Sequence, residues 1–101
     1  MGTVRWREVR ENGQLKIEEI HKVVVHRFVV RDSEDPEIYA AEPILEWQKT
    51  EAGEFVMKHA INRPEYKRYM NYETFGYLYS IIAELEKNKL VEFYLKFGQV
   101  K

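Results

Sequence analysis

Apolar residues recur at helical spacing in one stretch of the chain, residues 43–60 (PILEWQKTEAGEFVMKHA). At about 100° per residue, one arc of roughly 120° collects the apolar positions Ile44, Leu45, Ala52, Phe55 and Val56, with Trp47 beside it. The opposite side collects Glu46, Thr50, Gly53 and Glu54. The pattern predicts one amphipathic helix over residues 43–60, with its apolar arc turned toward a core.

Prolines set the expected ends of this helix. A proline deep inside a helix costs about 3 kcal/mol, so we expect the helix to begin at Pro43 and residues 36–41 to form a separate turn. Pro64 follows the last periodic residue, and a residue that precedes proline is disfavoured in helical geometry. The helix is therefore expected to end near Ala60.

Two polar residues, Gln48 and His59, interrupt the apolar arc. We interpret them as a buried polar pair, because buried polar groups are usually held by hydrogen bonds. The alternative is that His59 faces a cleft and acts as a general base. The other histidines, His21 and His26, are five residues apart, so on an uninterrupted strand they point to opposite faces.

A hairpin is predicted at the start of the chain, where residues 3–10 and 15–20 flank Asn12-Gly13. This dipeptide favours a two-residue loop because both of its residues tolerate positive φ. The resulting register places Arg7 opposite Glu18 and Glu8 opposite Ile17. Residues 23–30 (VVVHRFVV) are apolar on both faces, which is typical of a central strand.

A second hairpin is predicted from residues 75–86 and 90–97. A three-residue loop at residues 87–89 aligns their apolar faces, pairing Leu85 with Val91, Ala83 with Phe93, Ile81 with Leu95 and Tyr79 with Phe97. The other face then carries an apolar patch of Leu78, Ile82 and Tyr94 with no second helix to cover it. We expect this patch to form a homodimer interface.

These elements predict an α+β fold: an antiparallel sheet in ββαββ order with one main helix packed across one face. Residues 1–101 make a single domain. Residues 1–20 form its N-terminal hairpin, at the periphery, and residues 23–98 form its βαββ core.

Residues 63–74 (RPEYKRYMNYET) show neither helical nor strand period and are read as a connecting loop. The loop alternates bases and aromatics: Arg63, Tyr66, Lys67, Arg68, Tyr69 and Tyr72. Such a mixture can follow a phosphate backbone and stack bases. It also suits a protein-binding surface, where tyrosine and arginine are favoured anchors. A third reading is that the tyrosines cover the sheet edge while the cations stay in solvent.

Composition narrows the candidate chemistry. The net charge of −1 gives no global field that favours nucleic acid, and the absence of cysteine excludes disulfides and thiol catalysis. No membrane-spanning run is present, so we expect a cytoplasmic protein. The acids Asp32, Glu34, Asp35 and Glu37 could hold Mg²⁺ or Ca²⁺ through their oxygens. They lack the glycine and ligand spacing of an EF-hand loop, and the helix dipole and capping also explain acids at a helix start. We predict no catalytic residue, no metal and no cofactor.

A longer pattern joins DPEIYAAEPILEWQKTEAGEFVMKHA to YETFGYLYSIIAELE and FYLKFG, within residues 23–98. In this pattern the chain resembles small proteins encoded by tailed bacteriophages. The resemblance implies a viral origin and an accessory role in the host cytoplasm, and it assigns no activity to any residue.

The sequence therefore predicts a small non-enzymatic accessory protein that works by binding a protein partner or a second copy of itself. The alternative is a single-stranded nucleic-acid-binding protein that uses the loop of residues 63–74. No membrane interaction is expected.

Overall fold

The computed structural model describes residues 3–31, 35–71 and 76–99. In chain order the elements are β1 (Thr3–Glu11), β2 (Gln14–Val30), α1 (Pro36–Lys49), α2 (Glu51–His59), β3 (Glu65–Asn71), β4 (Gly76–Glu86) and α3 (Lys87–Phe97). The predicted α+β class is confirmed. The predicted ββαββ order is only approximate, because the observed order is ββααββα.

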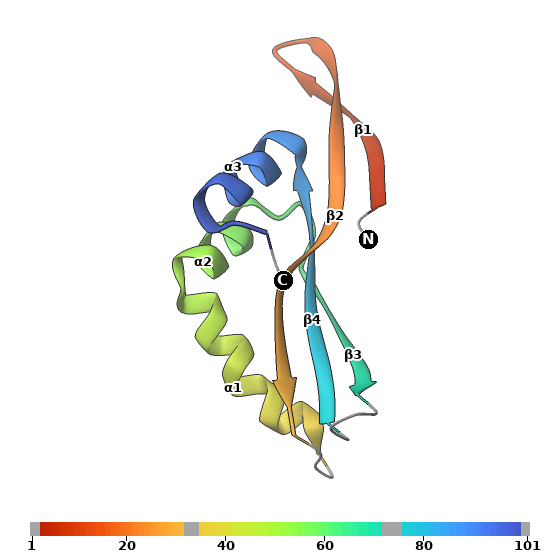
Figure 1. Cartoon of the computed structure of the whole chain (residues 1–101). Helices are drawn as coiled ribbons and strands as arrows, with labels where there is room; N and C mark the ends of the chain where they lie inside the picture. Colours follow the sequence, from red (N-terminus) through yellow and green to blue (C-terminus); the bar gives the residue numbers. More distant parts are fainter. Residues whose placement is uncertain (1–2, 32–34, 72–75, 100–101) are drawn as a thin grey trace.

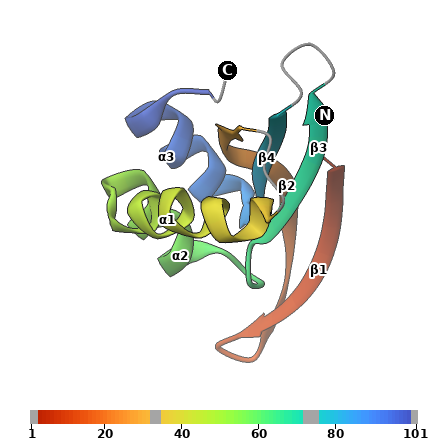
Figure 2. The same ribbon diagram turned by 90° about the horizontal axis from the view of Figure 1, so that it is seen from below.

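The four strands form one antiparallel sheet in the order β1-β2-β4-β3. β1 pairs with β2 as far as Lys22, whereas β3 pairs with β4 at the opposite end of the sheet. All three helices lie on one side of the sheet (Figures 1 and 2). The molecule is consequently elongated, with extents of 53 × 24 × 22 Å.

The N-terminal hairpin has the predicted register, with Arg7 opposite Glu18 and Glu8 opposite Ile17. Asn12 and Gly13 both have positive φ, of 52° and 77°, as a two-residue loop of this kind requires. The second strand of the hairpin does not end at residue 20. It is the first part of β2, a single strand of 17 residues, so residues 23–30 continue the same strand.

A bulge interrupts β2 where it pairs with β4. Val24 lies opposite Ile82 and His26 opposite Ile81, which leaves Val25 without a partner. An extra residue reverses the alternation of side chains. His21, opposite Leu85, and His26 therefore share a face of the sheet instead of pointing to opposite faces as expected.

The predicted single helix over residues 43–60 is two helices, and the first begins earlier. α1 starts at Pro36 and contains Pro43 in its interior. Pro43 cannot donate to the Tyr39 carbonyl, but the Tyr39 residue is 63% exposed, so water can satisfy that oxygen. The helix is tolerated here because its proline lies on an exposed turn, which the sequence pattern did not show.

Thr50 separates α1 from α2. Its backbone N–H donates to the Trp47 carbonyl at 3.0 Å and closes α1. Its side-chain Oγ1 accepts a hydrogen bond from the Gly53 N–H at 3.0 Å and caps α2. One residue thus ends one helix and starts the next, and residue 53, predicted to face solvent, is buried at the junction.

The predicted second hairpin is wrong. β4 matches its first strand, but residues 87–97 form the helix α3 instead of a returning strand. Leu90, Phe93 and Phe97, at spacings of three and four residues, turn toward the core, while Leu95 is 82% exposed. The helix buries one apolar stripe, as amphipathic helices do.

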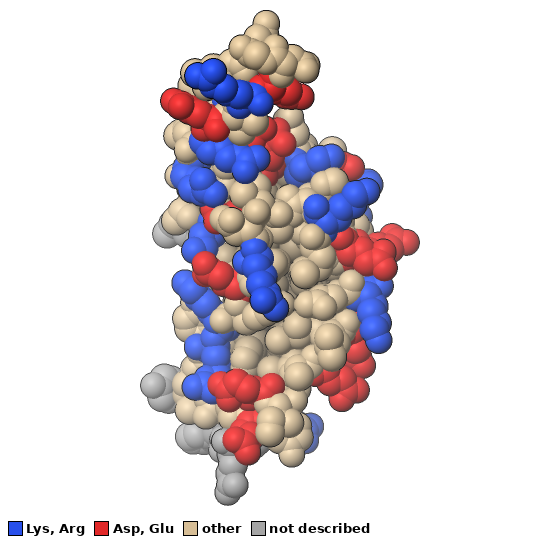
Figure 3. Space-filling model, turned by 180° about the vertical axis from the view of Figure 1, so that it is seen from behind, with Lys and Arg blue, Asp and Glu red and all other residues tan. Residues whose placement is uncertain are grey.

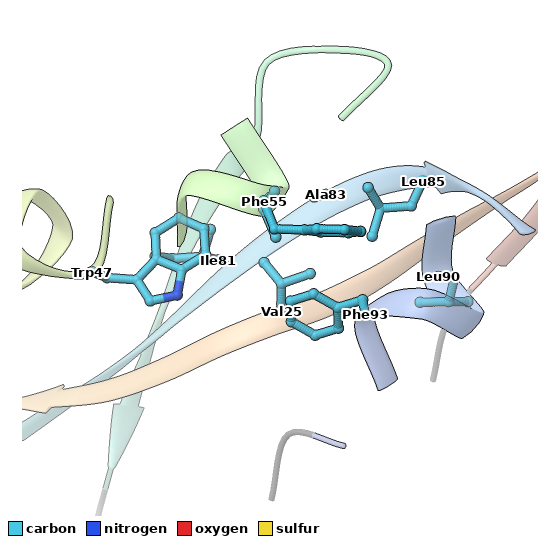
Figure 4. Close-up of a cluster of buried hydrophobic side chains, with 9 residues drawn as sticks. Val25, Trp47, Phe55, Ile81, Ala83, Leu85, Leu90 and Phe93 are labelled. Carbon is cyan, nitrogen blue, oxygen red and sulfur yellow. The ribbon is translucent and has the colours of Figure 1, made fainter. Parts of the chain in front are cut away.

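The main core lies between the helices and the covered face of the sheet (Figure 4). It contains Val25, Trp47, Phe55, Val56, Ile81, Ala83, Leu85, Leu90 and Phe93. The strand face with Tyr79, Ile81, Ala83 and Leu85 packs under helices as predicted, although three helices cover it rather than one.

Candidate interaction surface

Residues 63–74, expected to be a loop, contain the edge strand β3. Alternation along this strand divides the candidate binding residues between the two faces of the sheet. Tyr66 and Arg68 lie opposite Ile81 and Tyr79 on the helix side. Lys67 and Tyr69, opposite Ser80 and Leu78, lie on the other side. Arg63 precedes the strand, and Tyr72 lies outside the described residues.

The two residues on the helix side are engaged by α1. The Arg68 guanidinium donates to the Glu37 carboxylate and lies over the Tyr77 ring, 5.0 Å from its centroid. The Tyr66 hydroxyl accepts a hydrogen bond from Gln48 Nε2 at 3.3 Å. These contacts attach α1 to the sheet edge, so Tyr66 and Arg68 do not share a face with Lys67 and Tyr69.

The predicted dimer patch is also divided, because it rested on the hairpin that does not form. Leu78 and Ile82 lie on the face of the sheet that the helices leave uncovered. Tyr94 is on α3, on the opposite side of the sheet, where its ring packs edge-on against Phe93 at 6.1 Å. The three residues cannot form one interface.

The uncovered side of the sheet nevertheless brings together part of each predicted site. Lys67 and Tyr69 come from the candidate binding residues, and Leu78 and Ile82 come from the predicted dimer patch. We name as the open face the cross-strand rows Val24–Ile82–Glu65, Arg27–Ser80–Lys67 and Val29–Leu78–Tyr69. Glu65 at the end of the first row forms an ion pair with Lys22 at 3.2 Å. Val29 and Tyr69 are 59% and 51% exposed, and Arg27 and Lys67 are exposed as well. A basic row thus lies between the apolar row of Val29, Leu78 and Tyr69 and a row whose two apolar residues, Val24 and Ile82, are followed by Glu65. None of the helices in the described part of the chain packs over these rows.

The basic row is electrostatically open. Neither Arg27 nor Lys67 forms an ion pair with any residue that the structure describes. Ser80 between them is only 4% exposed, so their long side chains flank a short, buried one. Figure 3 shows basic side chains following the long edge of the molecule that lies away from the helices.

The other end of the same sheet face is closed by paired charges. Arg5 Nε donates to Glu84 Oε2 at 2.6 Å, and Asn62 donates to the other carboxylate oxygen at 2.8 Å. These two hydrogen bonds lower the pKa of Glu84 below its ordinary value of 4.5. Ile20, which is fully buried, lies opposite Arg5 in the register of β1 and β2.

Sequence reasoning did not find Arg27, Val24 or Val29 as partners of Lys67 and Tyr69. The bulge at Val25 shifts the alternation of β2, so Val24 and Arg27 share a face although they are three residues apart. No local pattern signals that bulge. The pairing of Lys67 with Tyr69 on one face follows from alternation alone, once residues 65–71 are recognised as a strand.

Gln48 and His59 do not form a buried pair. They lie on α1 and α2 respectively, both are half-buried, and Gln48 bonds Tyr66 instead. The His59 ring packs on Phe55, with centroids 4.6 Å apart. Partial burial, with Lys89 and Lys58 nearby, lowers the pKa of His59 below its ordinary value of 6.5. The neutral ring is therefore favoured at neutral pH.

His59 lines a groove of about 630 Å³ between α2 and α3. Its other lining residues are Glu51, Glu54, Phe55, Lys58, Glu92, Lys96 and Phe97. None of these side chains carries a hydroxyl or thiol that a neutral histidine could activate as a nucleophile. Among the lining residues one ion pair is formed, between Glu92 and Lys96.

Within the described ranges, no three histidine, aspartate or glutamate side chains are grouped as a metal site would require. Asp32 and Glu34 of the acidic cluster lie outside those ranges, whereas Glu37 bonds Arg68. Among the helices that the structure describes, none has the length and apolar character needed to cross a membrane.

Comparison with known proteins gives no functional assignment. No protein-family model, curated protein sequence or solved structure matches this chain. The chemistry of the open face is therefore the basis for a functional proposal.

Proposed function

We propose that the protein is a non-enzymatic interaction module that binds a protein partner on its open face. The observation that carries this proposal is the basic row Arg27–Ser80–Lys67, which has the apolar residues Val24 and Ile82 on one side and Val29, Leu78 and Tyr69 on the other, on a sheet face away from the helices. Glu65, at the edge of the first row, is already paired with Lys22. Uncovered apolar surface edged by polar groups is characteristic of interaction sites. The partner fitted by this arrangement is an apolar peptide segment that carries a carboxylate.

The residue types support a protein partner. Tyrosine and arginine are the side chains most often found as energetic anchors in interfaces, and Tyr69 and Arg27 both stand exposed here. A carboxylate placed over Ser80 would meet Arg27 on one side and Lys67 on the other. Apolar residues before and after it would lie on Val24 and Ile82 or on Val29 and Leu78.

We further propose an accessory role in the host cytoplasm for a protein encoded by a tailed bacteriophage. This part rests on the resemblance carried by residues 23–98. It agrees with a small chain whose exposed surface offers binding chemistry and whose groove between α2 and α3 is lined by no hydroxyl or thiol.

A peptide library displayed on phage particles tests the proposal directly. Peptides selected on the wild-type protein are expected to contain Asp or Glu flanked by apolar residues. Their affinity should fall at least about tenfold for the double variant Arg27→Glu, Lys67→Glu, because the row then carries negative charges that repel the carboxylate of the peptide. The control Lys87→Glu makes one charge reversal at the start of α3 and should bind normally. Equal binding to all three proteins would rule out the open face.

A second candidate function is the binding of single-stranded nucleic acid on the same face. The specific observation is that Lys67 lies two residues from the exposed Tyr69 on the same face of β3, with Arg27 in the same row as Lys67 on β2. Neither cation has a carboxylate partner among the described residues. A base can stack on such a ring while cations contact phosphates. The protein partner is favoured because Tyr69 is the single aromatic residue in the rows of the open face.

Fluorescence anisotropy with a labelled oligothymidylate separates the two functions. Nucleic-acid binding predicts an affinity that falls steeply with salt, with a slope that decreases by about one when Lys67 becomes glutamine. A complex that ignores salt, or the absence of any complex, excludes this candidate and leaves the peptide experiment as the test of the first.

A further inference from the structure

β1 is an open sheet edge along its whole length. We call β1 together with residues 14–22 of β2 the arm. Its tip extends beyond α3, and the free edge of β1 faces away from the helices (Figure 1). β1 contains no proline, and its register with β2 runs from Thr3 to Glu11 without a bulge. Proteins often use a proline or a bulge to block a long edge strand, because an open edge can pair with a strand of another chain.

The hairpin turn fixes which backbone groups point outward. Glu11 and Gln14 flank the two-residue turn, so they are the pair that the turn hydrogen bond closes. Bonded and non-bonded pairs alternate along an antiparallel ribbon. Counting back from Glu11, the residues that direct N–H and C=O groups to the free edge are Arg10, Glu8, Trp6 and Val4.

The free edge carries a charge pattern that complements itself. In antiparallel orientation about Val9, the segment Arg7-Glu8-Val9-Arg10-Glu11 places Arg7 opposite Glu11 and Glu8 opposite Arg10. A two-fold centre at Trp6 would oppose Arg5 to Arg7. Centres at Arg7, Glu8 or Arg10 would oppose each of these residues to itself. Like charges directly opposite one another destabilise a strand pair and opposite charges stabilise it.

We propose that the arm is a self-association site, at which β1 pairs with β1 of a second copy around a two-fold axis at Val9. Glu8 of one copy exchanges backbone hydrogen bonds with Arg10 of the second copy, using the outward groups of both. Their side chains form ion pairs on one side of the joined ribbon. On the other side, Arg7 meets Glu11 of the second copy.

The existing ion pairs fit this arrangement. Arg7 already contacts Glu18 at 2.8 Å and Lys16 contacts Glu11 at 3.5 Å within one arm. Pairing of two copies extends these contacts into a row of alternating charge across four strands. Glu8 and Arg10 make no ion pair among the residues described, so both are free to meet the second copy.

The geometry also keeps the two bodies apart. Val9 lies near the tip of the arm, and the paired strands run antiparallel, so the helical layers extend in opposite directions from the axis. The other edge strand does not offer the same match. Axes at Lys67 or Arg68 of β3 would place each of these cations against its own copy.

Charge reversal with reciprocal rescue tests the inference. Sedimentation equilibrium on the wild-type protein should show a monomer–dimer equilibrium. Arg10→Glu and Glu8→Arg should each weaken self-association at least about tenfold, because each variant opposes like charges at two positions. An equimolar mixture of the two variants restores both opposite pairs and should dimerise to within about threefold of the wild-type affinity.

Hydrogen exchange adds a readout of the register. Amides of Glu8 and Arg10 should gain protection with rising protein concentration, whereas the Trp6 amide, also outward but outside the five paired residues, should not. A wild-type protein that stays monomeric at millimolar concentration overturns the proposal, and so does a mixture that fails to restore the dimer. The variant Arg27→Glu, Lys67→Glu should dimerise normally, so failure here is distinguishable from failure of the open-face function.

Discussion

Gly53 lies so close to Trp47 that a Cβ atom added to it would stand 1.8 Å from the Trp47 carbonyl oxygen. That oxygen is held from the other side by Thr50, whose N–H and hydroxyl both donate to it, at 3.0 and 2.6 Å. The atoms nearest to the added Cβ belong to the backbone of Trp47 and Gln48, so no side-chain rotation relieves the clash. Only glycine permits the close approach of α2 to the end of α1.

We expect Gly53→Ala to destabilise the fold by about 3 kcal/mol, the upper part of the range for overpacked sites. The reason is that the α1–α2 junction must open to admit the methyl group. Urea denaturation gives the change in free energy of unfolding. The exposed neighbour Glu54, changed to alanine, is the matched control and should stay within about 0.5 kcal/mol of the wild type. Similar values for both variants would contradict the proximity of Gly53 and Trp47.

Thr50→Ala tests the capping side of the same junction. The substitution removes the oxygen that accepts from the Gly53 N–H and should cost about 1 kcal/mol of unfolding free energy. Thr50→Ser keeps an oxygen in that place and is expected to retain most of the stability. Thermal unfolding followed by circular dichroism compares the three proteins. If the serine variant loses as much as the alanine variant, the cap contributes nothing.

Two residues of α3, Phe93 and Leu95, distinguish a helix from a strand at residues 87–97. Phe93 is 2% exposed and Leu95 is 82% exposed, whereas two residues of the same parity on a strand would share one face. Phe93→Ala should cost about 3–5 kcal/mol, or remove the cooperative transition, and Leu95→Ala should change stability by less than about 0.5 kcal/mol. If Phe93→Ala removes the cooperative transition, the milder variant Phe93→Leu is compared with Leu95→Ala instead. A substantial loss with Leu95→Ala would argue for the strand.

The error at α3 has a physical origin in the sequence itself. Val91, Phe93, Leu95 and Phe97 fit a strand period of two, while Leu90, Phe93, Tyr94 and Phe97 fit the helical spacing equally well. Short apolar stretches of this kind satisfy both periods. The structure resolves the ambiguity by burial, because the residues shared by the two patterns, Phe93 and Phe97, pack on Phe55 of α2.

β3 was missed for a different reason. From Glu65 to Met70 every residue of this edge strand is exposed, so neither face imposes an apolar alternation on the sequence. The register of the N-terminal hairpin, by contrast, is predicted correctly because Asn12-Gly13 fixes it locally. Features that local geometry fixes can be predicted from the sequence. The open face cannot, because it depends on the bulge at Val25 and on the pairing of strands that are far apart in the sequence.

Glu84 joins three segments of the chain and gives the fold a predictable response to pH. Its carboxylate accepts from Arg5 on β1 and from Asn62, which precedes β3. The Ile61 N–H also donates to the Glu84 carbonyl at 2.9 Å. The Glu84 side chain is 19% exposed and that of Arg5 is 46% exposed, so salt screens their attraction only in part.

Because these partners lower the pKa of Glu84, the stabilisation is fully present above its ordinary pKa of 4.5 and is lost as pH falls through the lowered value. We expect Glu84→Gln to lose about 1 kcal/mol at pH 7, near the upper end for a partly exposed ion pair. Urea unfolding of this variant and the wild type should converge as the pH is taken well below 4.5. Glu46→Gln, at an exposed position of α1 without an ion pair among the described residues, controls for loss of net charge. A gap between wild type and Glu84→Gln that stays constant down to acid pH would show that the Arg5–Glu84 contact contributes nothing.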